Sequence, residues 1–387
     1  MDKISGDWSV HTGVVQSVIV IGAGQSGIAA ALALRREGLQ PLVLEAAEQP
    51  GGSWPQYYDS LSLFTPARFN GLPGFPFPGD PSHFPTRDET ADYLRDCAAA
   101  LDCELWTRTR VTAVTRADGF YLVRAETSAG HIVEIPASMI VAATGTFSHP
   151  HRPHLPVLDH YTGRVLHSAE YRNPAPFAGQ RVVVVGAGNS AVQIAADLAA
   201  HARVTVVSRS RIRYATRKPL PGASPVWAGL ALAARLPVGP LLARGSSSPL
   251  VFADRAVQAL GNPDYREMFS TARDTELRWP GGGTEHVDTV ILATGYRPAL
   301  SYLNCIGAPI ASDSPLQRHG LSLTEPGLGF VGLRHQRTLF SDTLHGVGRD
   351  ARYVSRRLVV SHSGSPPAGG LPTTARSGEH HAQHRQR

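Results

Sequence analysis

The sequence predicts an α/β protein built from two Rossmann-like domains, the second inserted into a first that is discontinuous in sequence. An apolar, strand-like stretch runs into a glycine-rich turn at residues 22–27, and the same pattern returns at residues 186–191. Each turn precedes a helix-like stretch and another apolar run, the order found in dinucleotide-binding units. The 387 residues fit two domains, and 42% apolar residues suffice for a large core.

The elements of the first unit follow from apolar spacing and capping residues. Thr86 and Glu89 form a capping box in front of one helix. Residues 50–85 show neither a helical nor a strand period, and the Pro- and His-rich stretch 148–156 suggests a domain boundary. The expected elements are a strand at residues 14–21, a helix at 28–36, a strand at 41–44, a helix from residue 87, and strands at 111–114, 120–125 and 139–143.

The first glycine turn has the spacing that binds a pyrophosphate. Gly22 permits the tight bend, Gly24 lets the backbone approach the ligand, and Gly27 lets the helix pack close to the strand. Glu45 stands 23 residues after Gly22, where a carboxylate can accept hydrogen bonds from a ribose. The alternative, a glycine turn without a ligand, is disfavoured by this strand, helix and carboxylate context.

The second unit repeats the pattern with one change of charge. Its expected elements are a strand at residues 181–185, a helix at 192–201, and strands at 204–207 and 288–293. Gly186, Gly188 and Ala191 form its turn, and the position 23 residues after Gly186 holds Arg209. A carboxylate at this position repels a 2′-phosphate, whereas a guanidinium can bind one.

These charges predict FAD or NAD in the first unit and NADPH rather than NADH in the second. Arg211 and Arg213 follow Arg209 closely, but each suits a solvated surface charge equally well. Two dinucleotide units on one chain favour electron transfer between two cofactors, in which a flavin receives hydride from NADPH.

Between residues 198 and 253 the chain is basic and contains no carboxylate. Nucleic acid is one partner for a basic chain whose formal net charge is +6. Arginines within one domain equally suit a phosphorylated small molecule, which we favour, so we expect no nucleic-acid partner. The cations of this stretch are Arg203, Arg209, Arg211, Arg213, Arg217, Lys218, Arg235 and Arg244.

Cysteine usage and hydropathy indicate a cytoplasmic protein. The spacing of the three cysteines matches neither a metal site nor a Cys-x-x-Cys pair. The histidine clusters at residues 149–154 and 380–384 are not accompanied by cysteines or carboxylates at ligand spacing, so we expect no metal. No apolar run reaches the length of a bilayer span, and residues 1–6 do not read as a secretory signal. We therefore expect reduced cysteines and no integral membrane association.

A disulfide reductase is disfavoured, because that class needs a reactive cysteine pair near the flavin. Its C-terminal flavin motif also ends in Gly-Asp, whereas Leu333 follows Gly332 here. Tyr161-x-Gly163-x-x-x-His167-x-x-x-Tyr171 instead resembles the fingerprint of flavin-containing monooxygenases. Further stretches resemble that superfamily, including its short bacterial members and plant indole-pyruvate monooxygenases: Gly51-Gly52-Ser53-Trp54, Thr65-Pro66-Ala67-Arg68, Phe75-Pro76-Phe77-Pro78, Leu292-Ala293-Thr294-Gly295-Tyr296 and Gly346-Val347-Gly348-Arg349-Asp350-Ala351.

The resemblance implies a monooxygenase reaction. NADPH reduces FAD, O2 forms a C4a-hydroperoxyflavin, and one oxygen passes to a nitrogen, sulfur or carbonyl carbon of a small organic substrate. The flavin is then the reactive group, and His167 belongs to the linker fingerprint, a role favoured over acid–base catalysis. The implied cofactor-binding residues are Gly22, Gly24, Gln25, Ser26, Gly27, Glu45, Gly52, Trp54, Val111, Thr144, Gly145, Gly186, Gly188, Asn189, Ser190, Ala191, Ser208, Arg209, Ala293, Thr294 and Gly295.

Two other functions stay open at this point: an NADPH oxidase or flavin reductase that does not oxygenate, and a redox-sensing flavoprotein without catalysis. Substrate and oligomeric state are not indicated. The expected domains are a flexible N-terminus at residues 1–13, FAD-domain segments at 14–155 and 296–360, an NADPH domain at 156–295, and a disordered tail at 361–387.

Overall fold

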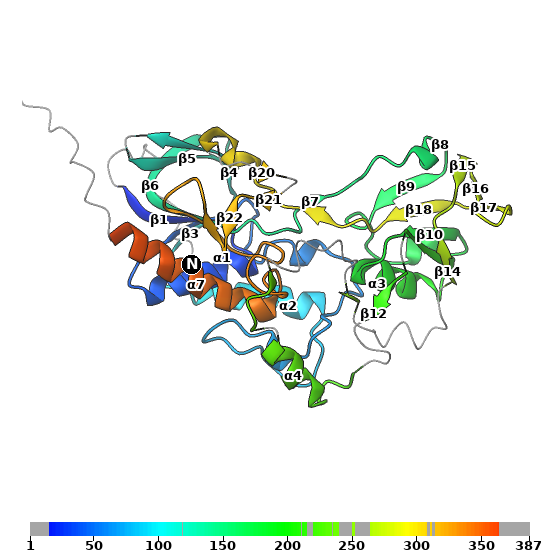
Figure 1. The fold of residues 1–387 in the computed structure, drawn as a ribbon, viewed down its shortest axis with the longest axis horizontal. Coiled ribbons are helices and arrows are strands. Elements are labelled where there is room, and N and C mark those ends of the chain that lie inside the picture. Colours follow the sequence, from blue (N-terminus) through cyan, green and yellow to red (C-terminus); the bar gives the residue numbers. More distant parts are fainter. Residues whose placement is uncertain are drawn as a thin grey trace, which may run out of the picture.

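The computed structural model contains two sheet-based bodies joined by two crossing segments (Figure 1). This arrangement confirms the predicted α/β class. The structure describes residues 15–117, 119–209, 211–214, 220–233, 235–239, 250–251, 264–307, 310–311 and 314–363. The predicted flexible N-terminus lies outside the described residues, as does nearly all of the predicted tail.

The first body is a nine-stranded sheet with a parallel centre. Its order is β22-β23-β24-β6-β1-β2-β3, and the antiparallel β4 and β5 extend from β6. Its strands come from two stretches of sequence, because β22 to β24 join the sheet after the second body is complete. The bounds are β1 Gln16–Ile21, β2 Leu42–Leu44, β3 Glu104–Trp106, β4 Thr109–Ala117, β5 Phe120–Thr127, β6 Ile132–Ala142, β22 Gln317–Arg318, β23 Leu321–Ser322 and β24 Leu328–Phe330.

Two helices cover one face of this sheet. The helix α1 (Gln25–Arg36) buries its alanines against β1, and α7 (Leu344–Ser363) packs beside it. Residues 361–363 were expected in the tail but are helical, because α7 continues through Ser363. Its signal is a helical spacing of buried side chains that the sequence reading missed: Leu344, Val347, Ala351, Val354 and Leu358.

The remaining elements of the first body follow the predicted pattern with shifted ends. The predicted capping box of Thr86 and Glu89 is present at the start of α2 (Arg87–Ala99). The strand β6 starts at Ile132 rather than residue 139, because its first half pairs with β5 at the solvent-exposed edge. Glu134, Pro136 and Ser138 interrupt the apolar residues there, which hides the strand from a search for continuous apolar runs.

The second body is a five-stranded, all-parallel sheet in the order β14-β11-β10-β18-β9. The helix α3 (Asn189–Leu198) starts directly after Gly188 and ends earlier than predicted, so its first turn faces the glycine loop. An ion pair between the buried Arg181 and the half-buried Glu285 (2.7 Å) links the central strand to a neighbouring hairpin. The strands are β9 Arg164–His167, β10 Arg181–Val185, β11 Arg203–Ser208, β14 Asp264–Glu267 and β18 Thr289–Leu292.

Short strands complete the structure. A small sheet of β8, β15, β16 and β17 lies beside the second body, and β7 pairs with β19 where the chain crosses between the bodies. Within the described ranges, no helix is both long and apolar enough for a bilayer span. The bounds are β7 His149–Pro150, β8 His160–Tyr161, β12 Arg213–Tyr214, β13 Leu250–Val251, β15 Thr271–Asp274, β16 Glu276–Arg278, β17 Thr284–His286, β19 Tyr296–Arg297, β20 Ile310–Ala311 and β21 Ser314–Pro315.

The segment 220–239, which contains α4 (Val226–Ala233), departs from the expected domain division. The sequence reading placed it with the nicotinamide domain at residues 156–295. It instead contacts the first body: Arg68 Nη2 donates to the Gly222 carbonyl (2.6 Å), and the Gly239 amide donates to the Arg337 carbonyl (3.0 Å). The reason is that an apolar side chain of this segment, Trp227, packs against Phe84 in a loop of that body.

Candidate active site

A cavity of about 2050 Å³ lies between the two bodies. Both glycine turns line it, together with the ends of the strands that precede them, as expected at the carboxyl ends of parallel strands. Pockets for a single small ligand usually measure roughly 300–1,000 Å³. This cavity is therefore large enough for two dinucleotides and a substrate.

At the first turn, backbone atoms of neighbouring segments lie so close that only glycine fits. Gly22 has a φ of +102°, and a Cβ there would lie 2.9 Å from the Ala143 carbonyl oxygen. A Cβ on Gly27 would overlap the Gly22 carbonyl, so α1 can approach β1 only because Gly27 lacks a side chain. Gly24 caps α1 at the cavity wall, where free helix N–H groups can bind phosphate.

Glu45 is buried at the end of β2 and lines the cavity. The Ala23 amide donates to its Oε2 (2.5 Å), and the Ala47 amide donates to its Oε1 (2.8 Å). Each carboxylate oxygen keeps a further lone pair for a ribose hydroxyl. Val111 also lines the cavity and lies beside a register shift in β4.

A chain of contacts surrounds the start of α1. Trp54 Nε1 donates to Gln25 Oε1 (3.2 Å), and Gln25 Nε2 donates to the backbone carbonyl of Asp342 (2.8 Å). Gly332 has a φ of +90°, and a Cβ there would overlap Ser26 Oγ. The sequence reading did not assign Gly332 or Asp342 to the site. Both lie in the C-terminal part of the chain, about 300 residues from the first glycine turn in sequence.

The second turn is built in the same way. A Cβ on Gly186 would lie 2.5 Å from the Ala293 carbonyl oxygen, and Ala191 is fully buried against the sheet. Arg209 directly follows β11 and lines the cavity, as does Arg213. Arg211 does not line it, so the structure separates two arginines that the sequence left equivalent.

Almost all predicted cofactor residues line this one cavity. The exceptions are Gly27 and Ala191, whose positions serve helix–strand packing. His167, which the resemblance assigns to the linker, does not line the cavity either. The further lining residues from the predicted set are Gly52, Thr144, Gly145, Gly188, Asn189, Ser190, Ser208, Ala293, Thr294 and Gly295.

The tyrosine and histidine fingerprint holds the linker in place. His167 is fully buried, its Nδ1 accepts from the Ala169 amide (3.1 Å), and its Nε2 therefore donates to the Gly295 carbonyl (3.0 Å). Tyr171 donates to Asp197 (2.7 Å), and a Cβ on Gly163 would overlap the Tyr161 ring. These contacts use both ring nitrogens of His167 and leave neither for substrate chemistry.

We expect the His167 ring to stay neutral where an ordinary histidine titrates. Burial is the main cause that lowers its pKa below 6.5. Nitrogen-15 NMR of histidine-labelled protein should show an Nε2–H ring at pH 6, with the resonance assigned from the His167→Gln variant. An imidazolium signal for this residue at pH 6 would contradict the assignment.

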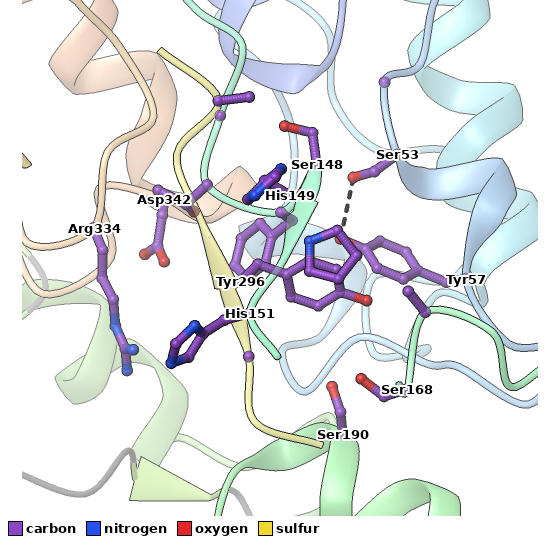
Figure 2. Close-up of a pocket in the computed structure, with 18 of the residues that line it drawn as sticks. Ser53, Tyr57, Ser148, His149, His151, Ser168, Ser190, Tyr296, Arg334 and Asp342 are labelled. Atoms are coloured by element: carbon purple, nitrogen blue, oxygen red, sulfur yellow. Dashed lines mark hydrogen bonds between the residues drawn. The ribbon is translucent and has the colours of Figure 1, made fainter. Parts of the chain in front are cut away.

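The structure adds wall residues that the sequence reading missed. Figure 2 shows Tyr57 and Tyr296 near the middle of the cavity, with Arg334 and Asp342 at one side. Ser53 Oγ lies 3.1 Å from the Tyr57 hydroxyl, and burial raises the pKa of this phenol, so it stays neutral. Tyr57 lies three residues after the stretch at residues 51–54, and Tyr296 is the last residue of the stretch at residues 292–296, so both were within reach of the motifs quoted for the resemblance.

Asn70 lines the cavity, but its side chain makes its hydrogen bonds within its own loop. Its Nδ2 donates to the carbonyls of Thr65 (2.9 Å) and Pro66 (3.0 Å), and its Oδ1 accepts from Thr65 Oγ1 (2.7 Å). The residues in the described ranges include no group of three or more metal-type ligands. None of the three cysteines lines the cavity.

Two Rossmann-like units that present glycine turns to one cavity are typical of oxidoreductases that pass electrons between a pyridine nucleotide and a flavin. The profile of the pyridine nucleotide-disulphide oxidoreductase family matches residues 19–226. The chain belongs to this family and to the flavin-containing monooxygenase superfamily. It is a flavin-dependent oxidoreductase of the monooxygenase kind, which confirms the resemblance drawn from its motifs.

Several known proteins are similar to most of this chain. A flavin-containing monooxygenase from Stenotrophomonas maltophilia is 30% identical with a TM-score of 0.75, over 89% of this chain and 98% of that one. Indole-3-pyruvate monooxygenase YUCCA1 of Oryza sativa subsp. japonica is 30% identical over 73% of this chain and 77% of its own. The oxidoreductase CzcO of Bacillus subtilis (strain 168) is 29% identical over 88% and 98%.

Proposed function

We propose that this protein is an NADPH-dependent FAD monooxygenase that transfers one atom of O2 to a nitrogen, sulfur or carbonyl carbon of a small organic substrate. The observation that carries this proposal is a pair of opposite charges at equivalent positions of one cavity. Glu45 follows β2 and Arg209 follows β11. Together with the family, this pair supports a flavin in the first unit and a phosphorylated nicotinamide nucleotide in the second.

The residues of the first unit fit FAD. The turn from Gly22 to Gly27 and the start of α1 leave room for a pyrophosphate, and Glu45 has lone pairs for an adenosine ribose. Gln25 and Trp54 are linked by a hydrogen bond at the cavity wall beside this turn. When bound, FAD would accept hydride from the nicotinamide and, once reduced, react with O2 for transfer to the substrate.

The residues of the second unit fit NADPH. Gly186, Gly188 and the start of α3 offer the same backbone groups to a second pyrophosphate. Arg209 would bind the 2′-phosphate, with Arg213 as a second cation on the same wall. The cavity is continuous between the two turns, which supports direct contact between the nicotinamide and the flavin.

The protein itself orients these groups and keeps water away. Trp54 meets Tyr57 edge to face with ring centroids 5.7 Å apart, and Tyr296 continues the aromatic wall. Burial raises the pKa of Tyr57 and of Tyr296, so both phenols remain uncharged at neutral pH. Uncharged aromatic side chains at this part of the wall would favour oxygen transfer to the substrate over loss of oxygen to water.

The proposal is tested with labelled oxygen. The purified protein is given NADPH, 18O2 and a panel of amines, sulfides, ketones and α-keto acids, with hydrogen peroxide measured in parallel. We expect one product whose mass rises by one 18O atom, with NADPH consumed in equal amount. Product oxygen that comes from water would reject the mechanism, and peroxide equal to the NADPH consumed for every substrate would identify an oxidase instead.

A further inference from the structure

Arginines without a protein partner line the cavity between the two bodies. Within the described ranges, those that line it make no hydrogen bond or ion pair with another residue, unlike Arg181, which is paired with Glu285. A guanidinium has five N–H donors and binds carboxylates and phosphates well, so unpaired arginines on one cavity indicate anionic ligands. These residues are Arg110, Arg209, Arg213 and Arg334.

Three of these arginines lie where the two cofactors would bring charge or a ribose. Arg209 and Arg213 line the wall of the second unit, where we place the 2′-phosphate. Arg110 lies at the ribose end of the first unit, because the amide of the residue before it donates to the Glu45 carbonyl (2.8 Å). The two pyrophosphates have the glycine turns and the helix starts behind them. Arg334 is therefore left without an anion from either cofactor.

The backbone that carries Arg334 is held in a fixed position directly after β24. Gln336 is fully buried, and its Oε1 accepts from the Leu333 amide (3.2 Å). Its Nε2 donates to the Phe330 carbonyl (2.7 Å). The close contact of Gly332 with Ser26 fixes the same loop against the start of α1. The exposed guanidinium of Arg334 is therefore presented to the cavity from a rigid base.

Asp342 does not neutralise Arg334. The two side chains lie on the same side of the cavity (Figure 2), and they do not form an ion pair. Burial raises the pKa of Asp342, although the charge of Arg334 opposes this effect. A carboxyl group with a raised pKa carries less negative charge than an ordinary aspartate, so it repels an anion less. The positive charge of Arg334 therefore stays available to a ligand.

The chain after Arg334 contributes to an apolar part of the cavity wall. His345 Nδ1 lies 2.9 Å from the Phe69 carbonyl oxygen, and Phe340 and Thr65 line one small apolar cavity, so residues 339–345 lie beside the loop at residues 63–70. From these two segments, five apolar side chains line the large cavity and form what we call the apolar lobe: Leu63, Phe64, Leu339, Phe340 and Leu344.

We propose that Arg334 recognises the substrate, and that the substrate is a small organic acid whose carboxylate binds this guanidinium while its apolar body occupies the apolar lobe. A guanidinium can bind a carboxylate through two parallel hydrogen bonds, which fixes the orientation of the acid as well as its position. This inference rests on the proposed function, because it names the class of substrate for that reaction.

The test measures binding without turnover, in the FAD-loaded protein and without NADPH. The probes are para-(methylthio)benzoate and its neutral match para-(methylthio)benzamide, followed by isothermal titration and by the change in flavin absorbance. We expect the acid to bind more tightly than the amide. Arg334→Gln should weaken binding of the acid by about tenfold or more, because a charge-assisted hydrogen bond is lost, and should change binding of the amide much less. Arg334→Lys should restore part of the loss.

The matched control is Arg318→Gln. Arg318 is exposed in β22 of the same body and does not line the cavity, so the change in net charge is the same. This variant should bind the acid like the unmodified protein. All variants are first checked for an unchanged thermal midpoint and flavin content.

Three results would overturn the proposal: equal affinity of the unmodified protein for acid and amide, unchanged binding of the acid in Arg334→Gln, or an equal loss in Arg318→Gln. Weaker binding of NADPH in Arg334→Gln with unchanged binding of the acid would assign this arginine to the nucleotide instead. Neither NADPH nor O2 enters the binding test of the acid. Its failure can therefore be told apart from a failure of oxygenation, which the labelled-oxygen experiment detects.

Discussion

Gly27→Ala is expected to yield a colourless protein with a free energy of unfolding lower by about 3 kcal/mol or more. The added methyl group would overlap the Gly22 carbonyl oxygen and lie 2.7 Å from its carbon. These are backbone atoms of the turn, so α1 must move away from β1 rather than a side chain move aside. The pyrophosphate cradle would open, and flavin absorbance after purification together with urea unfolding measures both effects.

Gly229→Ala is the matched control for this substitution. Gly229 lies in α4, and an added Cβ meets no atom within 4 Å. We expect this variant to keep its flavin and to gain slightly in stability, because alanine favours helices more than glycine by about 1 kcal/mol. Full flavin content and unchanged unfolding in Gly27→Ala would contradict the close approach of α1 and β1.

Arg209→Glu is expected to weaken NADPH binding by about 1–3 kcal/mol, or roughly 5- to 150-fold, while NADH binding changes little. The guanidinium would no longer bind the 2′-phosphate, and the new carboxylate would repel it. Isothermal titration with both nucleotides at one salt concentration measures the difference. Equal losses for NADPH and NADH would refute the 2′-phosphate role.

Arg211→Glu makes the same change in net charge two residues away and is the control. Both arginines are exposed, but Arg209 lines the cavity and Arg211 does not. We expect a smaller effect on either nucleotide, because Arg211 does not face the cavity and would make no direct contact with the 2′-phosphate. A similar loss in both variants would mean that long-range charge, not a contact, governs the preference.

The parts of the site that depend on backbone geometry could be predicted from the sequence. Glycines at residues 22, 24 and 27 directly after an apolar strand indicate a phosphate-binding turn. Thr86 and Glu89 determine where a helix starts through local hydrogen bonds alone. Glu45 and Arg209 were found because their distance along the chain from the turn is set by one helix and one strand. Such features depend on residues that are close in sequence, so they can be predicted from a short stretch of the chain.

The parts that depend on distant segments could not be predicted. Asp342 reaches the cavity because α7 returns to α1 from the far end of the chain, and Tyr57 lies in a stretch without a regular period. The position of α4 is decided by aromatic partners such as Phe84, which are more than one hundred residues away in sequence. No local sequence pattern indicates against which surface an apolar helix packs.

The paired crossings β7 and β19 constrain how the two bodies can move. Tyr296 faces Pro150 and Arg297 faces His149 in this short antiparallel ribbon, and Thr294 donates to the His151 carbonyl (2.6 Å) beside it. Neither crossing can slide along the other without breaking these bonds, whereas the ribbon as a unit can twist. The permitted motion is therefore a rotation of the second body about this ribbon. Such a rotation would move Arg209 together with its sheet, so that one end of a bound nucleotide comes closer to the first body while the other end moves away from it.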